Sequence, residues 1–261
     1  MRYDRLLDGK SAWITCGGAS SCNAYARLFS RHGAKITHIG GAEPGSRGGS
    51  AKFYECDLCD NARLERLCSG LLSESGAPDV YLHVADLFAP AYIDEMEFSD
   101  LERMLEIGVL APYAVMGLIA GPMAANGGGA AVFVAGHYGV QGMNRVSGYG
   151  AAKGAEIELA RALASEYAAG GVRVNAVVPG VSFPPVADDI LSQSAGDGSR
   201  EFWQTVQPVW RRGGEEDLAN AVLFLASDMA SRVNGQALLV NGAEHLIAHN
   251  HIFPRRDFKM P

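Results

Sequence analysis

The sequence has 261 residues, of which 48% are hydrophobic and 20% are charged, a composition typical of a globular protein with one large core or two small ones. Its formal net charge of −7 at pH 7 argues against nucleic-acid binding, which needs a basic surface. The N-terminus lacks the apolar core of a signal peptide and no apolar run approaches the roughly 18 residues that span a bilayer, so we expect a cytoplasmic protein without membrane contact.

Short apolar runs alternate with amphipathic segments along the chain. The runs predict strands at Ser11–Cys16, Lys35–Ile39, Lys52–Cys56, Val80–Ala85, Ala131–Ala135, Val172–Val178 and Ala237–Val240. The amphipathic segments predict helices at Ser21–Arg31, Asn61–Ser73, Phe98–Ala125, Gly148–Ala168 and Glu215–Ser227. This alternation predicts an α/β fold, a Rossmann-like doubly wound parallel sheet of about seven strands with helices on both faces.

The chain shows no linker and no internal repeat, so we expect residues 1–261 to form a single domain. Residues 181–200 carry Pro184, Pro185 and no clear period, which predicts a mobile loop over the carboxyl edge of the sheet. Residues 243–261 predict an extended C-terminal tail that is frayed or reaches a neighbouring subunit.

The chain has five cysteines, which do not suggest a disulfide scaffold and fit a reducing compartment. Cys56 and Cys59 form a single C-x-x-C, which is weak evidence for zinc without a second pair. The tail histidines fit a solvated tail better than a metal site; they are His245, His249 and His251. We therefore predict no metal.

The segment "GYGAAKGAEIELARALASEYAAGGVRVNAVVPG" places Tyr149 and Lys153 four residues apart on one helix. With "DLANAVLFLASDMASRVNGQALLVNGA" near the end, it resembles the short-chain dehydrogenase/reductase family over nearly the whole chain. The resemblance implies that Tyr149 exchanges a proton with the substrate oxygen while nicotinamide exchanges hydride, and that Lys153 holds the nicotinamide ribose. Residues four apart share a helix face, so the ammonium of Lys153 is expected to lower the pKa of Tyr149.

Two other positions that the resemblance makes catalytic carry glycine. The serine that steadies the substrate oxygen corresponds to Gly136, and the asparagine of the proton relay corresponds to Gly108. The neighbouring His137 is a weak substitute for the serine, because adjacent residues at a strand end point to opposite faces.

The dinucleotide-binding turn also departs from the family pattern. Aligning "TCGGASSCNAYARLF" with that turn puts Cys16, Ser20 and Cys22 at its three glycine positions, with Gly17 and Gly18 out of register. We expect these side chains to hinder the approach of a pyrophosphate, although the helix N-terminus still offers free N–H groups.

Further cofactor positions differ in the same way. Gly40 replaces the acid that the family often directs at the ribose, Asp86 replaces a glycine beside the nucleotide, and Pro184 replaces the carboxamide-binding threonine. Arg47 could meet a 2′-phosphate, although an arginine in an exposed loop without such a role is the commoner case, and Asp57, which would approach the adenine, still matches clearly. From these departures we predict no cofactor.

Three functions compete. The preferred hypothesis is a degenerate subunit that binds no NAD(P) and supports a catalytic paralogue in a heteromeric oxidoreductase, with a hydroxyacyl-CoA-type substrate by analogy only. The second is an NAD(P)-independent lyase or isomerase that uses Tyr149 and Lys153. The third is an NAD(P)-dependent alcohol or ketone oxidoreductase with an atypical glycine turn. The resemblance also implies dimers or tetramers, in which the helix of Tyr149 and the long helix before it form one interface.

Overall fold

A computed structural model describes residues 4–17, 19–41, 51–184, 186–193, 208–209 and 211–246. Its strands are β1 (Ser11–Cys16), β2 (Lys35–Gly40), β3 (Lys52–Glu55), β4 (Val80–His83), β5 (Gly129–Val134), β6 (Val172–Pro179) and β7 (Ala237–Val240). Its α-helices are α1 (Ala19–Arg31), α2 (Asn61–Ser75), α3 (Phe98–Leu105), α4 (Ala111–Ala125), α5 (Ser147–Tyr167), α6 (Val186–Gln193) and α8 (Glu215–Ala226).

All seven strands join one parallel sheet in the order β3-β2-β1-β4-β5-β6-β7. The order reverses between β1 and β4, so the carboxyl ends of these two strands flank a topological switch point, where doubly wound folds bind their ligands. The predicted fold class is confirmed.

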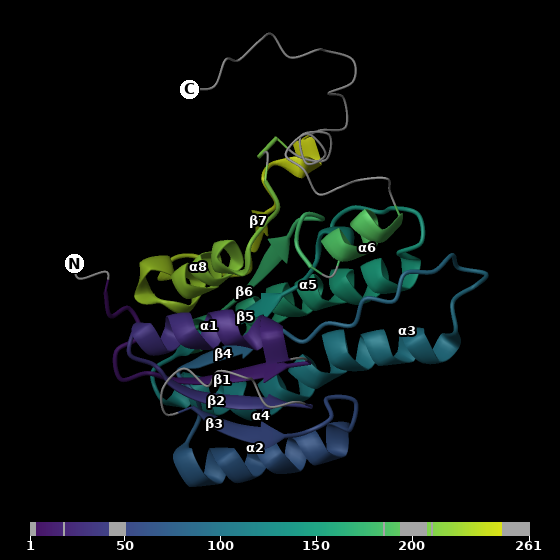
Figure 1. Cartoon of the computed structure of the whole chain (residues 1–261). Coiled ribbons are helices and arrows are strands. Elements are labelled where there is room, and N and C mark those ends of the chain that lie inside the picture. Colours follow the sequence, from purple (N-terminus) through teal and green to yellow (C-terminus); the bar gives the residue numbers. More distant parts are fainter. Residues whose placement is uncertain are drawn as a thin grey trace, which may run out of the picture.

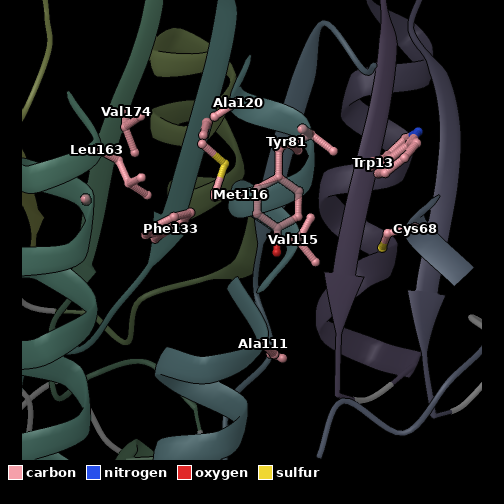
Figure 2. Packing of buried hydrophobic residues seen from close by; sticks show 14 of the residues in the cluster. Trp13, Cys68, Tyr81, Ala111, Val115, Met116, Ala120, Phe133, Leu163 and Val174 are labelled. Atoms are coloured by element: carbon pink, nitrogen blue, oxygen red, sulfur yellow. The ribbon is translucent and has the colours of Figure 1, made fainter. Parts of the chain in front are cut away.

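Helices cover both faces of this sheet (Figure 1). One face packs on α1 and α8 through a cluster that includes Ile14, Phe29 and Val222. The other packs on α2, α4 and α5 through a cluster in which Tyr81 and Phe133 meet edge to face, with ring centroids 6.2 Å apart (Figure 2). The central strands β1, β4, β5 and β6 are therefore buried on both sides, which is why their sequences are mostly apolar.

The long predicted helix Phe98–Ala125 has an internal change of geometry. Between α3 and α4 the segment η1 (Glu106–Leu110) is a π-helix, and the N–H of Ala111 donates to the carbonyl of Glu106 five residues earlier. Pro112 has no N–H to give to the carbonyl of Gly108, four residues before it, so the regular bonding pattern cannot continue here. The segment from Phe98 to Ala125 is long enough to cross a membrane, and its most apolar window of 18 residues has a mean hydropathy of 1.7.

The expectation that no apolar run approaches membrane-spanning length is therefore wrong for this helix. Its apolar face is used inside the protein, since Val115, Met116 and Ile119 are fully buried in the core against the sheet. A helix that covers a parallel sheet has the same composition as a membrane span, and packing rather than composition separates the two.

The loop predicted at 181–200 is partly helical, because α6 occupies Val186–Gln193. The segments 194–207 and 247–261 lie outside the described residues, so the predicted mobility of this loop and most of the predicted tail remain predictions.

Candidate active site

Tyr149 and Lys153 lie one turn apart on α5, above the carboxyl ends of β4 and β5. Both side chains are buried, with 3% and 2% of their surface exposed. Lys153 Nζ lies 5.7 Å from the centroid of the Tyr149 ring. The structure therefore brings together the two residues that the sequence analysis placed on one helix face.

Asp86, which follows β4, connects these two side chains. The hydroxyl of Tyr149 donates a hydrogen bond of 2.8 Å to Asp86 Oδ2, and Lys153 Nζ lies 3.2 Å from Asp86 Oδ1. The sequence analysis treated this carboxylate as a repulsive charge beside the nucleotide. In the structure its charge is paired with Lys153 and its oxygen faces the phenol, so it is part of the Tyr149–Lys153 cluster.

Glu156 is a second carboxylate in the cluster, and the sequence analysis missed it. Its side chain is fully buried and Oε2 lies 3.0 Å from Lys153 Nζ. Burial raises the pKa of Glu156 to about 7, against the opposing effect of Lys153. Burial lowers the pKa of Lys153, but Asp86 and Glu156 outweigh it, so the net shift is upward. The sequence did indicate this contact, because Glu156 follows Lys153 by three residues and so lies on the same, buried side of α5.

The pKa of Tyr149 moves opposite to the expectation. Burial and then the carboxylate of Asp86 raise it well above its ordinary value, because both disfavour the phenolate. The expected lowering by Lys153 is therefore wrong in this conformation, where the ammonium is already paired with two carboxylates. At neutral pH Tyr149 is a phenol and a proton donor.

The glycines at the serine and asparagine positions differ in the space around them. A Cβ on Gly136 would lie 3.0 Å from the hydroxyl oxygen of Tyr149, so the glycine leaves room beside the phenol. A Cβ on Gly108 would meet nothing closer than 4.0 Å, where Ala152 Cβ and Glu156 Oε2 lie. The carboxylate of Glu156 thus points toward the helix position at which the family pattern has an asparagine.

His137 does not replace the missing serine. It begins the short 3-10 segment η2 (His137–Gly139), and its Nδ1 lies 2.8 Å from Glu244 Oε1. Both side chains are buried, and Glu244 also accepts a hydrogen bond from the N–H of Val181. The imidazole of His137 therefore faces the segment after β7, although this contact does not have the geometry of a regular hydrogen bond.

The turn after β1 contains a disulfide between Cys16 and Cys22, with the two Cα atoms 6.2 Å apart. Both side chains are buried in the core cluster on the α1 side of the sheet. The expectation that these two residues hinder a pyrophosphate is therefore corrected, because their side chains point under the turn and not over it. The side chain of Ser20 is outside the part of the chain that the structure describes.

One further difference from the family pattern, the glycine at position 40, has a local explanation, and the other cofactor positions are placed as follows. A Cβ on Gly40 would lie 2.1 Å from the carbonyl oxygen of Cys16, so β1 and β2 approach too closely for a side chain here. Asp57 is exposed after β3, and its Oδ1 accepts a hydrogen bond of 3.0 Å from the N–H of Cys59. Pro184 is exposed beside the start of α6, whereas Arg47 lies outside the described residues.

The structure describes only some of the cysteines and histidines that the sequence singled out. Cys56 and Cys59 are free thiols, and neither belongs to a group of metal-ligating side chains among the described residues. His245 Nδ1 contacts the amide of Asn241, while His249 and His251 lie outside the described segments. One disulfide does not make a scaffold, but the sequence analysis did not foresee it.

The carboxyl edge fits a nicotinamide dinucleotide in three respects. The thirteen-residue helix α1 begins directly after β1 and offers its N-terminal N–H groups to a pyrophosphate. Gly17, between β1 and this helix, is exposed, and a Cβ there would be in ordinary van der Waals contact with the backbone of Asp86. The carboxylate of Asp86 is paired with Lys153, which reduces its repulsion of a phosphate.

Known proteins resemble this chain over most of its length. The family described as enoyl-(acyl carrier protein) reductase matches residues 18–243. The 7alpha-hydroxysteroid dehydrogenase of Escherichia coli (strain K12) is 30% identical over 90% of this chain and 94% of its own. The D-threitol dehydrogenase of Mycolicibacterium smegmatis is 28% identical over 92% of this chain and 94% of its own.

A solved structure agrees with these sequence relatives. The crystal structure of a short-chain dehydrogenase/reductase from Burkholderia xenovorans superposes with a TM-score of 0.80 at 30% identity, covering 97% of this chain and 99% of that one. Such relatives point to NAD(P) binding, so the prediction that this chain takes no cofactor is wrong. The error came from reading the glycine positions without knowing where the replacing side chains point.

Proposed function

The chain belongs to the short-chain dehydrogenase/reductase family, and from this membership we propose that it is an NAD(P)-dependent oxidoreductase that interconverts a hydroxyl and a carbonyl group on a small-molecule substrate. The observation that carries the proposal is the position of Tyr149 and Lys153, which are neighbours on α5 at the carboxyl edge of the sheet. This edge is where a doubly wound fold binds a dinucleotide and its substrate.

Tyr149 is the proton donor of the proposed reaction. Its raised pKa keeps the phenol protonated at neutral pH, which suits the reduction of a carbonyl. Gly136 leaves space directly beside the phenol oxygen, and a substrate oxygen would enter there. Bound NAD(P)H supplies the hydride.

Asp86 and Lys153 set the state of this donor. In the structure Asp86 accepts the hydrogen bond of the phenol, so a substrate oxygen must compete with this carboxylate or displace it. With 26% of its side chain exposed, Asp86 has room to turn toward solvent. Lys153 then remains as the charge beside Tyr149 and stabilises the phenolate that proton transfer leaves behind.

The cofactor would be held by the start of α1 and by the backbone at Gly17. Asp57 would approach the adenine from the end of β3, as the family resemblance implies. The same resemblance leads us to propose a homodimer or homotetramer that uses α4 and α5. Leu110 and Tyr113, with 47% and 62% of their surface exposed, support this face as the contact.

The other hypotheses are weaker. The relatives described above are oxidoreductases, and nothing in their names points to a partner paralogue or a heteromer. A cofactor-free lyase conflicts with the same relatives. The location in the cytoplasm and the substrate class stay predictions.

Binding and turnover measurements test the proposed function. Calorimetry with NAD(H) and NADP(H) should give saturable binding of at least one cofactor, and a panel of hydroxy and oxo compounds should reveal turnover. Tyr149→Phe should lower kcat by about 100-fold or more, since general acid catalysis contributes at least this much, while cofactor affinity is kept. Tyr138→Phe is the matched control, because Tyr138 stacks edge to face on Tyr149 at 6.4 Å. Absence of binding for every cofactor form, or full activity in Tyr149→Phe, would overturn the proposal.

A further inference from the structure

Three potential metal ligands meet beneath the turn after β1. Cys16 ends β1, Cys22 lies in the first turns of α1, and His38 lies on β2, which pairs with β1 in parallel register. The two sulfur atoms and a ring nitrogen of His38 all lie within 4.8 Å of one another. The set draws on three different elements, so it depends on the fold and not on a local sequence motif.

The imidazole of His38 has no evident structural partner. The residue is fully buried, and neither ring nitrogen makes a hydrogen bond to the residues that the structure describes. A buried polar group left without a partner costs roughly 1–3 kcal/mol each time, so its presence needs a reason.

We propose that Cys16 and Cys22 in their reduced form, together with His38, bind a zinc ion. Zinc takes thiolate sulfur at about 2.3 Å and imidazole nitrogen at about 2.0–2.1 Å, so in its tetrahedral geometry a bound sulfur and nitrogen lie about 3.6 Å apart and two bound sulfurs about 3.8 Å apart. The three ligand atoms already lie within 4.8 Å of one another, and after reduction the two sulfurs, which form a disulfide in the structure, must separate to the distance that a tetrahedral ion requires. Three protein ligands leave one coordination position for a non-protein ligand.

Charge favours zinc at this place. Two thiolates and one Zn²⁺ sum to zero, so the site adds no net charge to an interior lined by Ile14 and other apolar residues. Cys22 also lies near the N-terminus of α1, where the helix dipole stabilises a thiolate. A divalent ion therefore fits this buried pair better than a monovalent one, which would leave a negative charge in the core.

The disulfide and the zinc site are alternative states of the same two cysteines. Reduction by a dithiol breaks the S–S bond, the dithiol gives up two electrons and two protons, and it becomes a disulfide itself. Zinc then displaces the two thiol protons when it binds. Oxidised chain should therefore bind no zinc at this site, and zinc should protect the reduced pair from oxidation.

A metal titration tests the proposal and does not depend on the proposed enzymatic function. The untagged chain, reduced with a phosphine and freed of metal, is titrated with Zn²⁺ against a chromophoric chelator. We expect one ion per chain. Cys22→Ser should weaken zinc binding by about 100-fold or more. Even changes to residues that only support the ligands can lower the affinity for a metal by this much. With Co²⁺ as probe, a thiolate charge-transfer band should appear in the wild type and disappear in the variant.

Matched controls make the result decisive. Cys59→Ser alters a free thiol outside the site and should leave binding unchanged. His38→Ala should weaken binding as Cys22→Ser does, and wild type with the Cys16–Cys22 bond intact serves as a folded chain that cannot bind. Zinc binding that persists in Cys22→Ser, that is lost in Cys59→Ser, or that is absent from folded reduced wild type would overturn the proposal.

Discussion

The substitution Asp86→Asn gives the sharpest test of how the cluster controls Tyr149. The Asp86 carboxylate lies 2.8 Å from the phenol oxygen and raises the pKa of Tyr149, because a phenolate there would face a like charge. Two unit charges at this distance repel by about 1.5 kcal/mol at the dielectric constant of water and by about 6 kcal/mol at an effective value of 20. At about 1.36 kcal/mol per pKa unit, this corresponds to about 1 to 4 units.

Partial exposure of Asp86 favours the lower part of that range, so we expect the pKa of Tyr149 to fall by about 1 to 2 units in Asp86→Asn. The assay is the pH profile of kcat/KM in the direction of alcohol oxidation, supported by ultraviolet titration of the phenol. The limb that reports formation of the phenolate should move to lower pH. Glu156→Gln is the control, since Glu156 contributes less to the pKa of Tyr149 and should move the limb less. An unmoved limb, or one that moves to higher pH, would refute the assignment of Asp86.

Two further predictions concern stability. Gly40→Ala should lower the free energy of unfolding by about 1–3 kcal/mol in urea, because the added Cβ would meet the carbonyl oxygen of Cys16. Gly41→Ala is the control and should have little effect, since its Cβ would enter open space. Equal stabilities of the two variants would contradict the close approach of β1 and β2. The raised pKa of Glu156 means that the folded state holds a proton that the unfolded state releases, so its contribution to stability is complete below about pH 4.5 and is lost as the pH rises to about 7. Glu156→Gln should remove this pH dependence of the free energy of unfolding, whose slope is at most about 1.4 kcal/mol per pH unit. Unfolding of the wild type and the variant at pH 5 and pH 7 measures it. The same pH dependence in both proteins would contradict the raised pKa of Glu156.

The alternation of apolar runs and amphipathic segments was enough to predict the fold. Strand bounds were correct within two residues, as Val80–His83 and Gly129–Val134 show, because buried parallel strands are mostly apolar. The helix at Val186–Gln193 was not predicted from the sequence. It is short and directly follows two prolines, so its residues show no recognisable helical periodicity. The π-helical segment Glu106–Leu110 was not predicted, because Pro112 shows where the regular bonding pattern is interrupted but not which geometry the helix then adopts.

Part of the candidate site was predictable and part was not. The spacing of Tyr149 and Lys153 fixes them on one face of a helix, so their proximity follows from the sequence. The pairing of Lys153 with Asp86 does not, because these residues meet only when α5 packs beside the end of β4. The sign of the pKa shift of Tyr149 depends on that tertiary pairing, and so local spacing gave the wrong sign.

The turn after β1 shows why a lost glycine pattern is weak evidence for a lost ligand. The third glycine of such a turn lets helix and strand approach closely, which is a packing requirement. Cys16 and Cys22 meet the same requirement in another way, because their side chains turn inward and join α1 to β1 by a covalent bond. Only Ser20 occupies the position at which the backbone must approach a pyrophosphate, and Gly17 provides exposed backbone nearby. A substitution at a packing position changes what lies under the turn, and only one at the approach position changes what can bind above it.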